Sequence, residues 1–317
     1  MSLWDLSLSP TSGPPLVDRV DLSGAAMVGC GGIASATAWT LALLPLTGRP
    51  ILADHDHIDT EGTNLNRHLT ASHADLGKNK ADLTAALLTK AGASPDVHAV
   101  RWQDLPSAIR GAIRLGLVTV DDDPTRRAVQ LDLPRAILNA GTSDDGIYQV
   151  TFHDFLNGAC LGCIARADLR STGPEDSVAK RLGIPLEDLR PHLESSDPLP
   201  SELLARAKLQ PDERELLADT PGRQLVRRVC ADLRVTPTGP AVSAPMLSAA
   251  PGVLLAAEAV KHTVGSGLRL SGATNSLMAS ILRGPHHHWL RARAKQTDCE
   301  CAESAYIARF RHKWSLG

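Results

Sequence analysis

A glycine-rich turn between an apolar strand and a helical pattern constrains the fold of this chain more than any other feature. We expect a strand at residues 25–29, a helix at 33–46 and a second strand at 50–53 that ends at Asp54. The turn between the first strand and the helix holds three glycines: Gly29, Gly31 and Gly32. Strand, glycine turn, helix, strand and terminal carboxylate open a nucleotide-binding βαβ unit when they occur in this order.

The glycine turn has the chemistry to hold a phosphate group. Glycines let an anion approach the backbone amides at the start of a helix, where the helix dipole also attracts negative charge. Asp54 stands where a carboxylate can accept hydrogen bonds from ribose hydroxyls. These features fit NAD and ATP equally, and a plain tight turn of an α/β protein is the remaining explanation.

The alternation of strands and helices continues beyond this first unit. Helices are predicted at 77–91 and from residue 124, and strands at 97–100, 115–120, 135–139 and 149–152, the last as an edge strand. This alternation predicts a Rossmann-like α/β fold with a doubly wound, mostly parallel sheet.

Composition divides the chain into four parts. We expect an irregular N-terminal arm, an adenylation core of Rossmann type, a helical insertion, and a C-terminal return to the core: 1–22, 23–163, 164–238 and 239–317. The insertion is rich in Pro and charge, and its helical patterns lie at 200–208 and 223–233. The last part is expected to hold a helix at 252–264, antiparallel strands at 277–282 and 288–292, and a short polar tail from Cys299.

The charge balance and the hydropathy pattern argue against several classes of protein. The 317 residues carry a formal net charge of -2, whereas proteins that bind nucleic acid through phosphate contacts are usually basic. The longest apolar stretch, 241–257, is interrupted by prolines and is shorter than the roughly 20 residues that a bilayer requires. Residues 1–19 lack a signal-peptide pattern, so we expect a cytoplasmic protein without membrane or nucleic-acid partners.

Four of the six cysteines form two close pairs, Cys160 with Cys163 and Cys299 with Cys301. In a reducing compartment such pairs point to metal rather than to disulfides. Four thiolates can close a tetrahedral zinc site, which would tie the C-terminal strands to the main domain. The alternatives are unligated cysteines, or a site completed by one of the histidines at 286–288.

Three further segments carry a family resemblance: 54–59, 64–68 and 77–81. With the glycine turn, they make the chain resemble the ubiquitin-activating-enzyme-like adenylyltransferases of the ThiF, MoeB and HesA type. That superfamily includes the activators of sulfur carriers in thiamine and molybdopterin synthesis. The resemblance covers residues 24–163 and 238–301.

The resemblance implies roles for the residues around the glycine turn. The three glycines would cradle ATP: Gly29, Gly31 and Gly32. Asp54 or Asp56 would hold the ribose, and Asn64 and Arg67 would contact the phosphates. The four cysteines would hold a structural zinc, although the second pair here is C-x-C where the family has C-x-x-C.

The resemblance also implies a catalytic lysine and a magnesium ligand. Lys80 would approach the α- and β-phosphates of ATP. An aspartate with an arginine five residues later would bind Mg²⁺, and both Asp121 with Arg126 and Asp122 with Arg127 satisfy that spacing. We prefer Asp122 slightly, and at least one aspartate of the 121–123 triplet is expected to be an N-cap.

The chemistry of adenylation calls for such a set of groups on physical grounds. Attack of a carboxylate on the α-phosphorus of ATP sets one anion against another, so the site must supply positive charge aimed at the phosphoryl oxygens. Arg67, Lys80 and an Asp-held Mg²⁺ would supply it. A helix lysine is ordinarily a solvated group, but the Gly77–Lys80 spacing favours the catalytic interpretation here.

Cys230 lies on an amphipathic helical pattern, where related activators often place a thiol nucleophile. It could attack the acyl-adenylate and form a thioester, and the neighbouring Arg227 and Arg228 would lower the pKa of its thiol. A half-buried structural cysteine is the alternative. Cys30, inside the turn, is interpreted as a packing residue.

Three further departures from the family pattern stand out. The paired arginines of the family's N-terminal helix are not recognisable in residues 1–19, and the loop between Asp56 and Asn64 is two residues longer than usual. His68 stands where the family commonly has Gln.

The sequence therefore predicts an ATP-dependent adenylyltransferase, active as a homodimer. It would convert the C-terminal carboxylate of a ubiquitin-like protein, a sulfur carrier or a peptide into an acyl-adenylate. The alternatives are adenylation of a small molecule or a tRNA base by the same fold, a non-catalytic scaffold subunit, and an NAD-dependent oxidoreductase. The last would leave Asn64, Arg67, Lys80 and the cysteine pairs without a role.

Overall fold

The computed structural model describes most of the chain, with gaps. The described residues are 18–60, 62–142, 146–164, 178–179, 181–193, 195, 197–222, 225, 245–267, 269–280 and 290–316. The chain forms two compact units. The main unit comprises residues 1–165 and 243–317, and the insertion unit comprises residues 166–242.

The main unit is built on one sheet, whose eight described strands are ordered β10-β9-β8-β7-β6-β2-β4-β5. Five strands are parallel: β2 (Ala25–Val28), β4 (Ile51–Ala53), β5 (Asp96–His98), β6 (Leu115–Val118) and β7 (Ala136–Thr142). Three strands continue it in antiparallel fashion: β8 (Ile147–His153), β9 (Ser276–Ser280) and β10 (Leu290–Arg291). The predicted α/β fold, with a mostly parallel sheet and antiparallel C-terminal strands, is confirmed.

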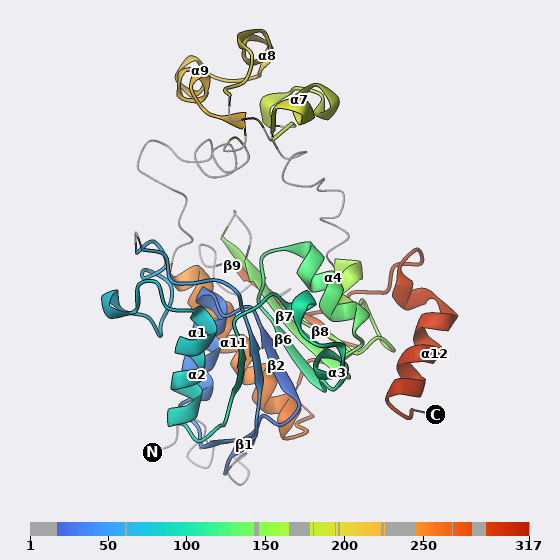
Figure 1. Cartoon of the computed structure of the whole chain (residues 1–317). Coiled ribbons are helices and arrows are strands. Elements are labelled where there is room, and N and C mark those ends of the chain that lie inside the picture. Colours follow the sequence, from blue (N-terminus) through green and yellow to red (C-terminus); the bar gives the residue numbers. More distant parts are fainter. Residues whose placement is uncertain are drawn as a thin grey trace. The chain divides into compact units, whose positions relative to one another are not determined.

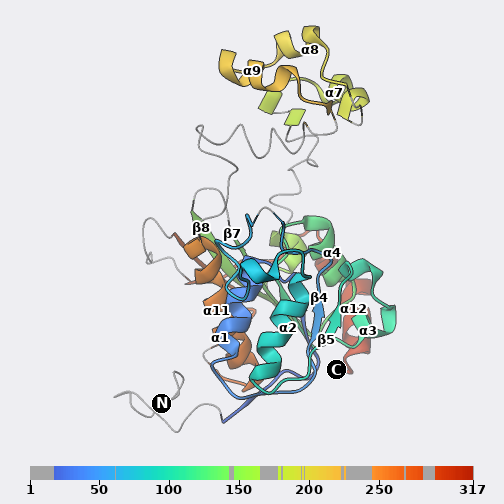
Figure 2. The ribbon, with the colours of Figure 1, turned by 60° about the vertical axis from the view of Figure 1, so that its left-hand side comes forward.

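The core strands are short and apolar, and helices cover both faces of the sheet (Figures 1 and 2). The first face packs against α1 (Gly32–Leu41), α2 (Lys80–Lys90) and α11 (Pro245–Thr263). The second packs against η3 (Trp102–Asp104), α4 (Asp123–Leu131) and α12 (Ser304–Lys313). The short helix α3 (Ser107–Gly111) lies on the second side as well. A sheet buried on both faces explains why its strands are apolar runs without alternation.

Three local expectations were wrong. Strand β8 is not an edge strand, because it pairs with β7 on one side and β9 on the other. The N-terminal arm is not irregular throughout, because β1 (Val20–Asp21) pairs with β3 (Leu46–Thr47). The segment after Cys299 is not merely a polar tail, because η4 (Glu300–Ala302) and α12 follow, and α12 buries Phe310 fully.

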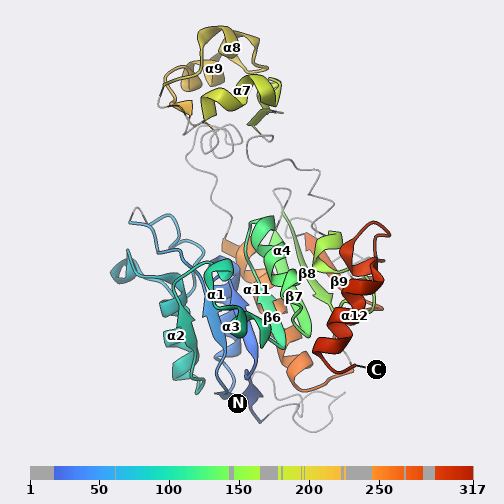
Figure 3. The ribbon, with the colours of Figure 1, turned by 45° about the vertical axis from the view of Figure 1, so that its right-hand side comes forward.

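The insertion unit is helical in its described part, where three of its helices gather into a small bundle (Figure 3). These are α7 (Leu186–Leu193), α8 (Ser201–Arg206) and α9 (Pro211–Ala218). Leucines form most of its core, among them Leu182, Leu189 and Leu217. The helix predicted at 223–233 lies outside the described residues, and so does Cys230.

Within the described ranges, no helix combines the length and the apolar character needed to cross a membrane.

Candidate active site and metal centre

The strand order places the candidate site at the carboxyl ends of β2, β4 and β6. Strand β2 lies between β4 and β6, so the chain leaves the first strand in one direction and returns on its other side. Ligands of open α/β sheets bind at such a switch point, outside the carboxyl ends of the strands. Gly29 follows β2, Asp54 follows β4, and the aspartate triplet 121–123 follows β6.

The glycine turn needs its glycines for two different reasons. Gly29 has a φ of +85°, and a Cβ there would lie 2.8 Å from Val120 Cγ1, so a side chain would be strained and would clash. Gly31 is the N-cap of α1, and a Cβ there would meet nothing within 4 Å. The first turn of a helix leaves N–H groups without intrahelical partners, and the open side of Gly31 gives an anion access to them.

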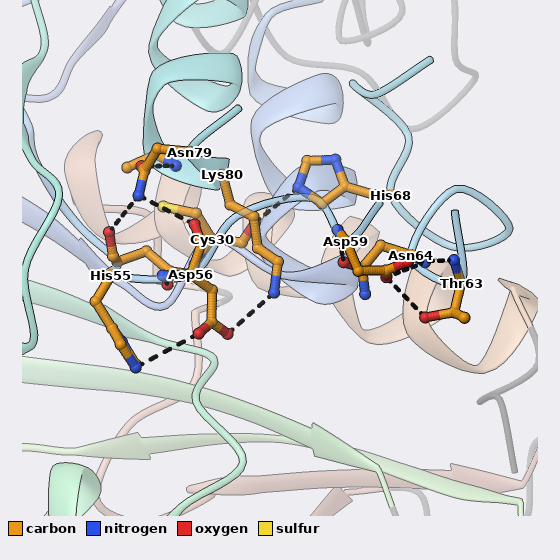
Figure 4. Close-up of polar contacts among 11 residues, drawn as sticks. Cys30, His55, Asp56, Asp59, Thr63, Asn64, His68, Asn79 and Lys80 are labelled. Atoms are coloured by element: carbon orange, nitrogen blue, oxygen red, sulfur yellow. Dashed lines mark hydrogen bonds and ion pairs between the residues drawn. The ribbon is translucent and has the colours of Figure 1, made fainter. Parts of the chain in front are cut away.

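The peptide groups of Cys30 are held on both sides. Its N–H donates to Asp54 Oδ2 over 2.5 Å. Its carbonyl oxygen accepts from His68 Nε2 over 2.8 Å (Figure 4). The other oxygen of Asp54 accepts the N–H of Asp56 over 2.8 Å. The carboxylate of Asp54 therefore ties the end of β4 to the glycine turn, and each oxygen keeps a lone pair for a further donor.

His68 holds the backbone of the glycine turn, and the sequence alone gave it no role. A carbonyl oxygen only accepts, so Nε2 carries the proton, while Nδ1 accepts from Thr70 Oγ1 over 3.1 Å. Burial lowers the pKa of His68, against the opposing effect of the bond to Cys30, so the ring is neutral at pH 7. The available signals were its place directly after Arg67 and its position where the resembled family commonly has Gln.

Lys80 is the first residue of α2, and its ammonium group is aimed at the carboxyl end of β4. Its Nζ lies 3.0 Å from Asp56 Oδ2, and its side chain is 12% exposed, whereas that of Asp56 is 53% exposed (Figure 4). Burial raises the pKa of Asp56, but the hydrogen bond and charge of Lys80 outweigh it, so the pKa is lowered. A buried cation with an exposed, exchangeable partner is suited to receive another anion.

Asn79 positions both halves of this ion pair and is a second residue that sequence reasoning missed. Its Oδ1 caps α2 by accepting the N–H of Ala81 over 2.8 Å. Its Nδ2 donates to the main-chain oxygens of Asp54 and Asp56, over 3.0 Å each. An Asn directly before a helix predicts a cap, but not the tie to β4.

The long loop after β4 is closed by its own side chains. Asp59 accepts the N–H groups of Thr63 and Asn64 and the hydroxyl of Thr63, over 2.7 to 3.0 Å. The side-chain oxygen of Asn64 accepts the N–H of Asp59 over 3.1 Å, so Asn64 stabilises the loop (Figure 4). The closed loop brings Arg67 against the start of α1, where its Cγ lies 3.2 Å from the Cβ position of Gly32.

The three aspartates after β6 have different surroundings. Asp122 is the N-cap of α4, and its Oδ1 accepts the N–H of Thr125 over 2.8 Å. Asp123 forms an ion pair with Arg126 over 2.9 Å, and Asp121 is exposed. The end of β6 lies beside the glycine turn, because Thr119 Oγ1 donates to the carbonyl oxygen of Gly29 over 2.9 Å.

The four paired cysteines form one buried cluster on the second face of the sheet, and each is at most 2% exposed. The Sγ–Sγ distances are 3.7 Å for Cys160–Cys163, 3.5 Å for Cys160–Cys299 and 3.4 Å for Cys163–Cys301. These distances exclude disulfides and come close to the edges, about 3.8 Å, of a tetrahedron with Zn–S bonds of about 2.3 Å.

Backbone amides support this cluster. The N–H groups of Cys163 and Gln296 each lie 3.4 Å from a ligand sulfur, as amides around thiolates do in closed structural sites. The residues present therefore fit a tetrahedral metal ion. The alternative with a histidine from 286–288 falls outside the described residues. Cys30 is apart from the cluster, and burial raises the pKa of its thiol, which suits a packing residue.

A comparison with protein families finds a similarity in the N-terminal part of the chain. Residues 6–111 match the model of the ThiF family, so this segment of the chain is similar to that family. Its glycine turn, the carboxylates after β4 and the following loop fall within the matched residues.

One bacterial protein is similar to the chain over a longer stretch. The protein y4jF of Sinorhizobium fredii is 30% identical over 316 residues, which are 93% of this chain and 59% of y4jF. The chain thus spans less than two thirds of the length of that relative.

Crystal structures of E. coli MccB share the fold. The structure with ATP has a TM-score of 0.54 at 17% identity and covers 90% of this chain and 67% of MccB. The complex of MccB with N-formylated MccA has a TM-score of 0.55 at 16% identity and covers 91% and 69%. At this identity the likeness concerns the fold alone.

Proposed function

We propose that this chain is an ATP-dependent adenylyltransferase of the ThiF family, which activates the C-terminal carboxylate of a peptide or a small carrier protein. The observation that carries the proposal is the convergence of Arg67 and Lys80 on a glycine turn at the switch point of the sheet. MccB, which has this fold, was crystallised with ATP and with the peptide MccA, and that pairing supports the same class of reactants here.

The reaction joins two anions, and the residues of the site counter that repulsion. A carboxylate oxygen of the acceptor forms a bond to the α-phosphorus, and the bond from that phosphorus to the bridging oxygen breaks, releasing pyrophosphate. Lys80 and Arg67 stabilise the charge that builds up on the phosphoryl oxygens, and the amides after Gly31 hold a phosphate. Loss of one such aimed cation costs about 3 kcal/mol, or about a hundredfold in rate.

The ion pair between Lys80 and Asp56 gives the site an exchangeable cation. In our proposal the phosphates replace Asp56 as the partner of Lys80, and the released carboxylate accepts a ribose hydroxyl beside Asp54. Asn79 keeps both aspartates in place during this exchange, because it bonds to their main-chain oxygens rather than to their side chains.

Two metal ions complete the proposal. Asp122, or Asp121, would hold Mg²⁺, which when bound neutralises charge on the triphosphate. The four cysteines would hold one Zn²⁺ in a closed structural site, without an open position for catalysis.

Finer features remain part of the proposal. They are a homodimer in the cytoplasm, an acceptor that is a ubiquitin-like protein or sulfur carrier rather than a free peptide, and a thioester on Cys230. We also retain the proposed division into an arm, a core, an insertion and a C-terminal return at 22, 163 and 238.

ATP–pyrophosphate exchange with matched lysine variants tests the proposal. Lys80→Met is expected to lower acceptor-dependent exchange about a hundredfold, because it removes the cation next to the phosphates. Lys78→Met is the control, because Lys78 is exposed and its ammonium group, among the described residues, pairs with Asp75 alone. Equal activity of the two variants would contradict the role of Lys80. Exchange driven by small carboxylic acids but not by peptides would move the acceptor to the small-molecule class.

A further inference from the structure

Helix α4 links the candidate magnesium ligand to the four-cysteine cluster. Asp122 caps its first turn, and Gln130 lies eight residues later, about 12 Å along the helix axis. The C-terminal half of α4 packs into the same hydrophobic cluster as the segment 160–163, called the cysteine loop below, and as Phe310 of α12.

Gln130 makes the contact with the cysteine loop and is fully buried. Its side-chain oxygen accepts the N–H of Gly162, which lies between Cys160 and Cys163, over 2.5 Å. A Cβ on Gly162 would lie 2.8 Å from Gln130 Nε2, so the loop approaches the helix as closely as a glycine allows. Because the two cysteines are fixed by their partners in the cluster, this bond fixes the helix in turn.

The C-terminal residues hold the same end of α4 by its carbonyl groups. Tyr306 donates its hydroxyl to the main-chain oxygen of Gln130 over 3.1 Å. Lys313 Nζ donates to the oxygen of Leu133 over 3.0 Å, and Trp314 Nε1 donates to the same oxygen over 2.9 Å. The oxygen of Gln130 also accepts the N–H of Leu133 over 3.0 Å, and Leu133 lies just beyond the C-cap, so these donors hold the turn in which α4 ends.

Leu133, at this end of the helix, has a backbone conformation that costs free energy, so the surrounding contacts must stabilise it. It is buried and has a φ of +52°, a left-handed conformation that costs a non-glycine residue about 1 to 2 kcal/mol. A further contact comes from Glu300, between Cys299 and Cys301, which pairs with Arg127 on α4. Both halves of the cysteine cluster therefore contact this one helix.

We propose that Gln130 is a positioning residue, through which the four-cysteine cluster fixes α4 and thereby the direction of the Asp122 carboxylate. The inference rests on the proposed function in assigning that carboxylate to Mg²⁺. The cysteine cluster, at the C-terminal end of α4, would thus affect the candidate active site at the N-terminal end of the same helix.

The test compares Gln130→Met with Leu131→Met in the metal-loaded protein. Methionine fills the space of Gln130 but cannot accept the amide of Gly162, whereas Leu131, next to it on α4, is 44% exposed. Gln130→Met is expected to retain its zinc by elemental analysis but to exchange the amide hydrogens of residues 123–131 about tenfold faster. It should also need about fivefold more Mg²⁺ for half-maximal pyrophosphate exchange, with ATP affinity in the absence of Mg²⁺ unchanged.

Amide exchange and Mg²⁺ dependence equal to those of Leu131→Met would overturn the inference. A purely structural role would lower the melting temperature without moving the Mg²⁺ dependence, and that result would also count against it. If Gln130→Met does not fold, Tyr306→Phe decides, because it removes only the hydroxyl that bonds to α4. Unchanged amide exchange of α4 in Tyr306→Phe would then refute the inference.

The proposed function can fail separately. If the wild-type protein shows no pyrophosphate exchange with any acceptor, the adenylation proposal fails. Hydrogen exchange in α4, measured without nucleotide, still decides whether Gln130 fixes the helix.

Discussion

His68 donates a hydrogen bond to the main-chain oxygen of Cys30 over 2.8 Å, from a position 38 residues further along the chain. On the other side of Cys30, its N–H is held by Asp54. The backbone that leads into the glycine turn is thus fixed from two directions before any ligand arrives. Because such amides are already in position, little free energy is spent on reorganisation when an anion binds. Preorganised donors of this kind stabilise a bound anion most strongly.

His68 can be tested with a residue that keeps its donor. Gln offers an amide N–H at a similar reach, so His68→Gln is expected to bind ATP within about threefold of wild type. His68→Leu leaves the buried carbonyl of Cys30 without a donor, which costs about 1 to 3 kcal/mol and lowers ATP affinity about tenfold. Isothermal titration calorimetry measures both variants. Equal affinities for the two would show that the turn holds its shape without this bond.

The magnesium ligand can be separated from the helix cap at Asp122. Asn is as good an N-cap as Asp, so Asp122→Asn is expected to keep the stability of the protein while losing the negative charge. If Asp122 holds Mg²⁺, pyrophosphate exchange falls about a hundredfold while the melting temperature stays unchanged. Asp121→Asn is the matched comparison. A loss confined to Asp121→Asn would assign the ion to Asp121 instead.

Much of the fold could be predicted from the sequence, because short apolar strands and the glycine turn are local signals. The position of β8 in the sheet could not. The alternation of Tyr148, Val150 and Phe152 tells which face each side chain joins, but it does not tell how many neighbours a strand has. The second neighbour, β9, comes from a segment more than 120 residues later.

The charged residues of the candidate site could be predicted from the sequence, but the residues that hold its backbone in place could not. Lys80 and Arg67 were recognisable from a spacing that is local in sequence. Asn79 and His68 act on main-chain atoms of residues 23 to 38 positions away, and such contacts exist only once the chain has folded. The same holds for α12, because the sequence does not tell which of its apolar side chains becomes buried, and in the structure it is Phe310.

The contact between α1 and α11 predicts a marked effect of one added methyl group. At Gly252, a Cβ would lie 2.5 Å from the oxygen of Ile33 and 2.6 Å from Ala36 Cβ. Gly252→Ala is therefore expected to destabilise the protein by about 1 to 3 kcal/mol, despite the higher helix propensity of Ala. Gly111→Ala in α3 is the control, because its Cβ meets nothing within 4 Å. Chemical denaturation should show a lower midpoint for Gly252→Ala alone.

His262 predicts how stability changes in mild acid. Its ring stacks on Phe152 with centroids 4.5 Å apart, and burial, helped by the charge of Arg269, lowers its pKa to about 4. In the unfolded chain its pKa is about 6.5, so between those values the unfolded state binds the additional proton. The contribution of His262 to the free energy of unfolding is therefore fully present above about pH 6.5 and is lost as the pH falls. At pH 5 the loss from this residue is about 1 to 2 kcal/mol. His262→Phe keeps a ring against Phe152 and removes the titration. Its loss of stability between pH 7 and pH 5 should therefore be smaller than that of the wild-type protein by that amount.

Urea denaturation at the two pH values measures the difference. An identical loss in both proteins would show that His262 is protonated in the folded state as readily as in the unfolded one.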